Sequence, residues 1–286
     1  MLKVKEFGGD YYSLFDSKEK LFIKRRLELE KEITHGIERN QFDVVYQPQI
    51  DADTHEVYGV ECLLRWNHPE QGDIPPSVFI PIAEDNGVIK ELGALVLKKA
   101  CHQSKQWRKN NIFKGIMAIN VSIKQFERND LLTQVKEILS NEMLEGDAIE
   151  IEVTESLFSE ENIHLNPTLF AIRKLGVKIA IDDFGTGYSS LKRLQKLPID
   201  NVKIDKCFVE NIVNSKEDAS IIQALILMSK TFGFNLIAEG VESHEQANKL
   251  KALGLINHQG FLYSTPLKAK DFEVWLNEFN QNKERK

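Results

Sequence analysis

The sequence predicts an α/β fold, a (β/α)8 barrel in which central strands are surrounded by helices. Short apolar runs alternate with segments of helical periodicity from residue 42 onward, which indicates a parallel sheet covered by helices. Eight strand candidates in about 240 residues suit a closed barrel better than an open doubly wound sheet. The first two candidates lie too close together for a helix between them, so we expect the barrel to be irregular at its start.

The strand candidates are short apolar runs, many of them rich in β-branched residues. They cover residues 42–49, 57–66, 115–121, 148–155, 178–184, 201–205, 235–241 and 260–264. The segments with helical periodicity cover residues 17–39, 90–107, 131–142, 219–233 and 244–254. Gly233 and Gly254 end the last two of these, at the position where glycine commonly caps a helix C-terminus.

The first helical segment, 17–39, is highly charged and carries Leu21, Leu27 and Ile33 in approximate helical register. A helix that lacks a core of its own is typical of a linker. We therefore expect residues 1–28 to be the remnant of a connection to an upstream domain and residues 29–280 to form the barrel domain.

Composition narrows the class of protein. A hydrophobic content of 42% and a charged content of 28% indicate a globular chain, and a net charge of −6 argues against a broad surface for long nucleic acids. The dispersed cysteines Cys62, Cys101 and Cys207 fit reduced thiols rather than disulfides or a zinc site. No apolar run approaches the roughly 18 residues of a membrane span, so we expect no membrane span and a cytoplasmic location.

Polar side chains stand near the ends of nearly all the apolar runs. Because the carboxyl ends of parallel strands meet on one face of an α/β barrel, these side chains should converge there. A single polar residue at a strand end is most simply a solvated loop residue, but seven in the same relative place predict a site. They are Gln47, Glu61, Asn120, Glu152, Asp182, Lys203 and Glu239.

This predicted site is rich in carboxylates, because Asp183 adjoins Asp182 in the stretch IAIDDFGTGYSS. Four or five carboxylates in one cavity repel one another unless a cation is present. Oxygen ligands without cysteine or histidine suit Mg²⁺ or Mn²⁺, and adjacent aspartates can serve two ions, as in phosphodiester displacement. The alternative for the aspartate pair is a surface turn with Asp at a helix N-terminus.

Two cations are predicted at the same face. Lys203 could orient a water or neutralise a phosphate, or it could simply pair with Asp205, which alternates with it on the strand. Arg65 suits a bidentate phosphate contact, whereas its neighbour Trp66 is more often a packing residue.

Taken in order, nine short motifs resemble the motif series of EAL domains, from about residue 30 to residue 275. They are YQPQI (46–50), ECLLRW (61–66), FIPIAE (79–84), NVS (120–122), EVTES (152–156), IDDFGTGYSSL (181–191), VKIDK (202–206), AEGVE (238–242) and QGFLYSTPL (259–267). The resemblance implies a TIM-like barrel whose first strand is antiparallel to the others. It also implies hydrolysis of one phosphodiester bond of cyclic di-GMP to linear pGpG, with two Mg²⁺ or Mn²⁺ ions.

The resemblance also assigns roles to individual positions. The metal ligands it implies are Glu61, Asn120, Glu152, Asp182 and, for a second ion, Asp183. It places Lys203 near the attacking water and makes Glu239 a general base or a further ligand. It implies substrate contacts for Gln47, Arg65, Asp205 and Gln259, and a role for Glu155 in steadying the glycine-rich loop that follows Asp183.

One position departs from the family motif, since Cys62 occupies the alanine position of the Glu-Ala-Leu triplet. The side chain alternates away from Glu61, and cysteine packs as a small apolar group, so we expect little loss of activity. The resemblance further implies a homodimer and an upstream regulatory domain of the GGDEF type.

Two other functions stay open at this point. The first is a non-catalytic cyclic di-GMP receptor or scaffold, which would keep the fold but lose metal ligands. The second is a Mg²⁺-dependent lyase or isomerase of the enolase kind, which also places carboxylates and lysine at strand ends.

Overall fold

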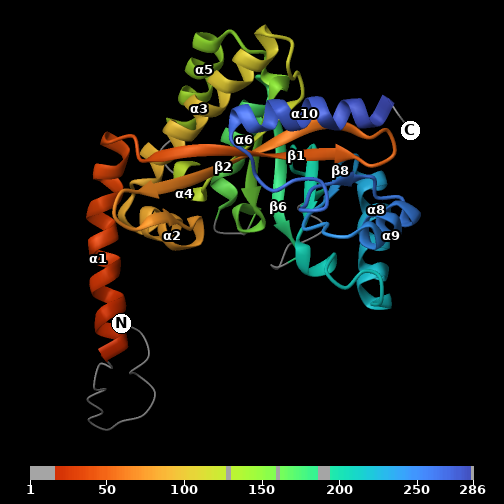
Figure 1. Cartoon of the computed structure of the whole chain (residues 1–286), viewed down its shortest axis with the longest axis horizontal. Coiled ribbons are helices and arrows are strands. Elements are labelled where there is room, and N and C mark those ends of the chain that lie inside the picture. Colours follow the sequence, from red (N-terminus) through yellow and green to blue (C-terminus); the bar gives the residue numbers. More distant parts are fainter. Residues whose placement is uncertain (1–16, 127–129, 159–161, 186–193, 285–286) are drawn as a thin grey trace.

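In the computed structural model, which describes residues 17–126, 130–158, 162–185 and 194–284, eight of the described strands close into a barrel surrounded by helices (Figure 1). Around the barrel the order is β1-β9-β8-β7-β6-β5-β4-β2, and β2 pairs with β1 to complete the circle. The barrel strands are β1 (Phe42–Asp51), β2 (Glu56–His68), β4 (Ile116–Asn120), β5 (Ile149–Thr154), β6 (Lys178–Phe184), β7 (Asn201–Ile204), β8 (Asn235–Ala238) and β9 (Asn257–His258). The predicted barrel is confirmed.

The first strand is antiparallel to both of its neighbours, β2 and β9, whereas the other barrel strands pair in parallel. Only four residues join β1 to β2, and so short a connection permits only an antiparallel hairpin. The irregular start of the barrel is therefore confirmed, and its cause is this hairpin. A β-bulge opposite Gln49 and Ile50 gives β2 one extra residue, Tyr58.

Helices cover the outside of the barrel, and α10 lies across β1 (Figure 1). The α-helices are α1 (Ser17–Glu38), α2 (Pro76–Asn86), α3 (Ile89–Lys109), α4 (Ile123–Phe126), α5 (Asp130–Glu142), α6 (Asn166–Arg173), α8 (Lys216–Phe232), α9 (His244–Leu253) and α10 (Ala269–Glu284). Gly233 and Gly254 end α8 and α9 in the left-handed conformation, as predicted. Ser243 and Gln246 form a reciprocal capping box that begins α9.

The helix α1 joins the barrel through a second, smaller core. Leu29 and Ile33 are buried against Phe42, Trp66 and Phe79 from β1, β2 and α2, while the N-terminal part of α1 extends away from the barrel (Figure 1). The predicted helix exists, but the apolar residues in its helical register are not all buried, because the side chain of Leu27 is 53% exposed. The proposed domain boundary at residue 29 stays a prediction.

Sequence patterns misplaced one strand and missed several elements. Residues 260–264 form turns rather than a strand, since the backbone of Gly260 packs so closely on Val241 that a Cβ there would lie 2.1 Å from its carbonyl oxygen. The strand is β9, which ends before them. The missed elements include β3 (Gly72–Ile74), α2, α6 and α10. Among the described residues, no helix is long and apolar enough to cross a membrane.

Candidate metal centre

Lys203 lies at the centre of the barrel mouth and is fully buried. In the described part of the chain, its Nζ lies close to oxygens of four carboxylates. The distances are 2.7 Å to Glu239, 3.0 Å to Glu152, 3.0 Å to Asp182 and 3.3 Å to Glu61. The alternative in which Lys203 forms an ion pair with Asp205 is wrong, because Asp205 is not among these four carboxylates. Asp205 instead accepts a hydrogen bond from the backbone N–H of Cys207 at 2.9 Å.

Strand register brings these side chains together. Across the parallel pairs, Asn120 lies opposite Glu152, and Asp182 lies opposite Thr154, two residues beyond Glu152 on the same face. The seven polar residues do converge, but the prediction that each ends a strand was wrong for Gln47 and Glu61. These two lie opposite each other in the middle of β1 and β2, because both strands continue past the barrel mouth.

Two amides hold the carboxylate of Glu61. Asn120 donates to its Oε1 at 2.6 Å, and Gln259 donates to its Oε2 at 2.5 Å and to Gln47 at 3.2 Å. Gln49, which was not predicted, orients Gln259 by donating to its Oε1 at 3.1 Å. The signal for Gln49 was its two-residue spacing from Gln47, which places both on the same face of β1.

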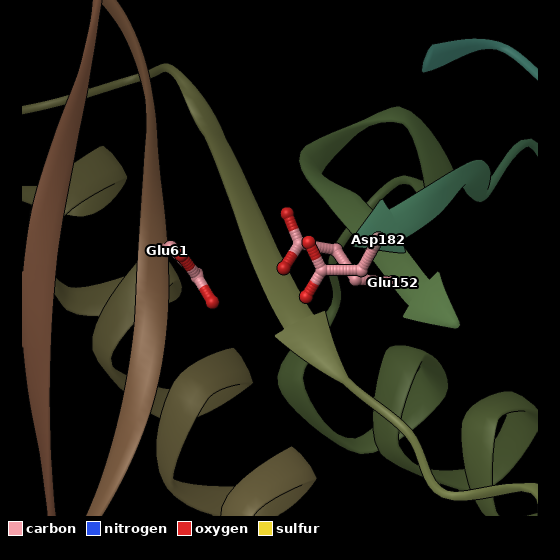
Figure 2. Close-up of side chains that lie close together, drawn as sticks. All are labelled: Glu61, Glu152 and Asp182. Carbon is pink, nitrogen blue, oxygen red and sulfur yellow. The ribbon is translucent and has the colours of Figure 1, made fainter. Parts of the chain in front are cut away.

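Two sets of carboxylates could each hold a cation. Among the described residues, one set is Glu61, Glu152 and Asp182, and the other is Asp182, Asp183 and Glu239, with the ligand atoms of each set within 4.8 Å of one another. Figure 2 shows Glu61 pointing across the barrel toward Glu152 and Asp182. The Oε1 atom of Glu152 is buried and has no hydrogen-bond partner within the described part of the chain, although buried polar atoms are nearly always paired. Oxygen ligands arranged in this way fit a hard divalent ion such as Mg²⁺ or Mn²⁺.

The electrostatics of the site depend on burial. Burial raises the pKa of Glu152 well above its usual value, and it raises that of Glu239 to about 8, with the neighbouring carboxylates adding to both effects. Burial opposes ionisation of Glu61 as well, but Lys203, Gln259 and Asn120 together lower its pKa. The pKa of Lys203 is raised well above its usual value by the surrounding carboxylates, despite burial. One ammonium therefore does not neutralise the site, and bound cations would allow more of its carboxylates to ionise.

Comparison with known proteins identifies the family. A model of the EAL domain matches residues 30–266. This chain belongs to the EAL domain family. It is 36% identical over 273 residues to the oxygen sensor protein DosP of Escherichia coli, an alignment that covers 96% of this chain and 34% of DosP. It is also 36% identical over 270 residues to the bifunctional diguanylate cyclase/cyclic di-GMP phosphodiesterase MucR of Pseudomonas aeruginosa, covering 94% and 39% of the two chains.

A solved structure titled as the MucR phosphodiesterase in complex with c-di-GMP has the same fold. Its TM-score is 0.82 at 37% sequence identity, over 86% of this chain and 99% of that one. The chain spans about a third to two fifths of the length of DosP and MucR, so the EAL domain is one part of those proteins.

At the end of β6 this EAL domain holds an unusual backbone conformation. Asp183 has φ of 53°, in the left-handed region that residues other than glycine seldom adopt, and such strain is typical of functional sites. Burial and the neighbouring Asp182 and Asp205 raise the pKa of Asp183 to about 6. Glu155 accepts a hydrogen bond from the backbone N–H of Gly185 at 3.1 Å, where the predicted glycine-rich loop begins. Residues 186–193, which include most of that loop, lie outside the described residues.

A cavity of about 270 Å³ adjoins the carboxylates of the EAL domain. Arg65, Asn120 and Glu152 line its polar side, and apolar residues of α2 and α3 such as Ile80 and Leu92 line the rest. The guanidinium of Arg65 donates to the carbonyl of Leu64 at 2.9 Å, while Trp66 is a packing residue, as expected.

Sequence reasoning missed three polar residues of this cavity, Glu84, Ser122 and Gln125. The hydroxyl of Ser122 donates to Glu84 at 2.7 Å, and Gln125 accepts from the backbone N–H of Ser122 at 3.0 Å. The signal for Glu84 and Ser122 was their place in the motifs FIPIAE and NVS.

Proposed function

We propose that this EAL domain hydrolyses one phosphodiester bond of cyclic di-GMP to give linear pGpG, with the help of two Mg²⁺ or Mn²⁺ ions. The observation that carries the proposal is the pair of carboxylate sets that share Asp182. Glu61, Asn120, Glu152 and Asp182 would hold one ion, and Asp182, Asp183 and Glu239 would hold the other. The similarity to MucR, a bifunctional diguanylate cyclase/cyclic di-GMP phosphodiesterase, supports the same substrate.

Two bound ions would make a water acidic enough to attack near neutral pH and would balance the negative charge of the phosphodiester. The side chains have separate tasks. Burial raises the pKa of Glu239 to about 8, and a bound cation would favour its ionised form, in which the carboxylate can accept a proton from the attacking water. Lys203 touches Glu239 and three other carboxylates, so it orients the general base and offsets the repulsion within the site.

The cavity beside the carboxylates suits a nucleotide base, because most of its lining is apolar and Glu152 and Asn120 line one part of it. Arg65 would then contact a phosphate at the edge of the cavity. Gln47, Asp205 and Gln259 stay predicted substrate contacts. In the structure Gln259 donates to Glu61, and Asp205 caps the turn after β7.

Several finer proposals follow from family membership. We propose that the protein acts in the cytoplasm, that an upstream GGDEF-type domain regulates it, and that it forms a homodimer. The resemblance to EAL domains implies pairing through the helix after the glycine-rich loop, and part of that segment lies outside the described residues. Residues 1–16 of the expected linker also lie outside them. Sedimentation that finds only monomer at micromolar concentration would contradict the dimer.

The competing functions predict different chemistry. A receptor would bind cyclic di-GMP without cleaving it, and the complete set of oxygen ligands disfavours this. A lyase or isomerase of the enolase kind needs a base poised over a carbon acid and a site for a substrate carboxylate. The two carboxylate sets sharing Asp182 favour phosphodiester hydrolysis instead.

The test is hydrolysis of cyclic di-GMP with Mg²⁺ or Mn²⁺, followed by chromatography of pGpG. Glu61→Ala and a chelator should each abolish product, whereas Glu137→Ala, an exposed carboxylate on α5, should leave the rate unchanged. Binding is measured in parallel. If wild-type protein binds the nucleotide but yields no pGpG under any metal condition, the receptor is the correct function.

A further inference from the structure

A short turn after β7 lies between the two halves of the second carboxylate set. That set is divided between β6, which carries Asp182 and Asp183, and the residue directly after β8, Glu239, and β7 separates these two strands in the sheet. Hydrogen bonds of the sheet therefore do not join β6 to β8 directly. The turn begins at Asp205 and continues as the 3-10 helix η4 (Lys206–Phe208).

Toward β6, the ring of Phe208 lies against Gly185. A Cβ at Gly185 would lie 2.6 Å from Cε2 and 2.9 Å from Cζ of that ring, closer than real side chains allow, and the φ of Gly185 is 102°. The backbone N–H of Gly185 is bonded to Glu155. Gly185 is thus held by Phe208 and Glu155 together, two residues beyond Asp183.

Toward β8, the same turn lies against Gly240, the residue after Glu239. A Cβ at Gly240 would lie 2.5 Å from the Cβ of Lys206, and the φ of Gly240 is 65°. At its start, the turn also lies near β6, where the carboxylates of Asp205 and Asp183 interact with each other. The turn thus contacts the backbone or side chains next to ligands on both neighbouring strands.

We infer that the turn Asp205–Phe208 sets the separation between Asp183 and Glu239, and that Phe208 is a positioning residue for the second metal ion. The inference rests on the proposed two-ion function. The first carboxylate set comes from β2, β5 and β6. Its members Glu61 and Glu152 lie on β2 and β5, whereas the turn follows β7. Loss of Phe208 should therefore weaken one ion site and spare the other.

The test counts bound Mn²⁺ by electron paramagnetic resonance of the free ion during titration of the full chain without nucleotide. Wild-type protein should bind two ions. Phe208→Ala should bind the first ion as wild type does and the second at least tenfold more weakly. Phe208→Leu, which keeps most of the bulk, should restore part of the second affinity. Phe232→Ala removes another half-buried ring, at the C-terminal end of α8 before β8 begins, and should leave both affinities unchanged.

The outcomes separate this inference from the function on which it rests. If wild-type protein binds fewer than two ions, the two-ion proposal itself fails. If wild type binds two and Phe208→Ala binds both with wild-type affinity, or loses both equally, the positioning role is wrong. If Phe208→Ala does not fold, as judged by circular dichroism, Phe208→Leu decides, and wild-type affinity for the second ion in that variant overturns the inference.

Discussion

Lys203 on β7 and Glu239, the residue after β8, lie 2.7 Å apart between Nζ and Oε1, the shortest of the four ion pairs that Lys203 makes with described residues. Lys203 also contacts Glu61, Glu152 and Asp182, and it is fully buried. In metal-free protein one ammonium thus provides most of the positive charge inside a ring of carboxylates. A buried charge is tolerated only with partners of opposite charge, so Lys203 and the carboxylates around it depend on one another.

We predict that Lys203→Met destabilises the metal-free protein by about 3–5 kcal/mol, the usual cost of removing one partner from a buried ion pair. Because divalent ions would supply the missing positive charge, Mn²⁺ should restore more stability to the variant than to wild type. Urea unfolding with EDTA and with Mn²⁺ measures both effects. An equal loss under the two conditions would show that Lys203 does not share the carboxylates with metal ions.

A second prediction concerns Glu150, which lies one layer below Glu152 on β5 and accepts a hydrogen bond from Asn201. Burial raises the pKa of Glu150 from 4.5 to about 7. The folded protein then binds a proton that the unfolded chain releases, so stability falls as the pH rises from about 4.5 through about 7. Glu150→Gln cannot ionise, and it should be more stable than wild type at pH 8 by on the order of 1–3 kcal/mol.

That advantage should shrink at pH 5, where Glu150 is already protonated in the folded protein. Urea unfolding at pH 5 and pH 8 in the presence of EDTA provides the comparison. Glu145→Gln on the surface is the matched control, and it should show no pH-dependent gain. If Glu150→Gln is equally or less stable than wild type at pH 8, Glu150 is ionised in the fold.

Sequence patterns predicted the barrel and most of the residues at its mouth, because strand alternation and parallel register determine where those residues lie. Two-residue alternation places Glu150 and Glu152 on one face of β5, and parallel register brings Asn120 and Asp182 beside them. These relationships are local along the chain. The position of Gln47 was predicted by the wrong reasoning, since its strand is antiparallel and its contact with the site depends on pairing with Glu61 in the middle of β2.

Other features could not be predicted because they depend on residues distant in sequence. The bond from Gln49 to Gln259 joins β1 to a segment about 200 residues later, and the close approach of Phe208 to Gly185 depends on the packing of two turns. Periodicity contains no information about such contacts. The burial of Leu29 instead of Leu27 depends likewise on where α2 meets α1.

We predict that Cys62→Ala keeps activity within about twofold. Cys62 is buried on the outer side of β2, near Cys101 and facing away from Glu61, and its pKa is raised strongly by burial, so the thiol is an inert packing group. Loss of the sulfur atom should cost about 1 kcal/mol of stability. Measuring kcat and KM for pGpG formation, beside thermal unfolding, checks both statements. A tenfold fall in kcat with intact folding would give Cys62 a role in catalysis.

The helix α1 carries two apolar residues, Leu27 and Ile33, that differ in burial and can therefore be compared. Ile33 is fully buried in the smaller core with Phe42, Trp66 and Phe79, whereas Leu27 is largely exposed. Ile33→Ala should lower the free energy of unfolding by about 2–4 kcal/mol, because it removes buried methyl groups and leaves a cavity. Leu27→Ala should change it by less than about 0.5 kcal/mol, since alanine favours a helix and little burial is lost. Urea unfolding of the full chain measures both. If the two variants were equally stable, the C-terminal half of α1 would not be part of the barrel domain, and the boundary at residue 29 would have to move toward residue 39.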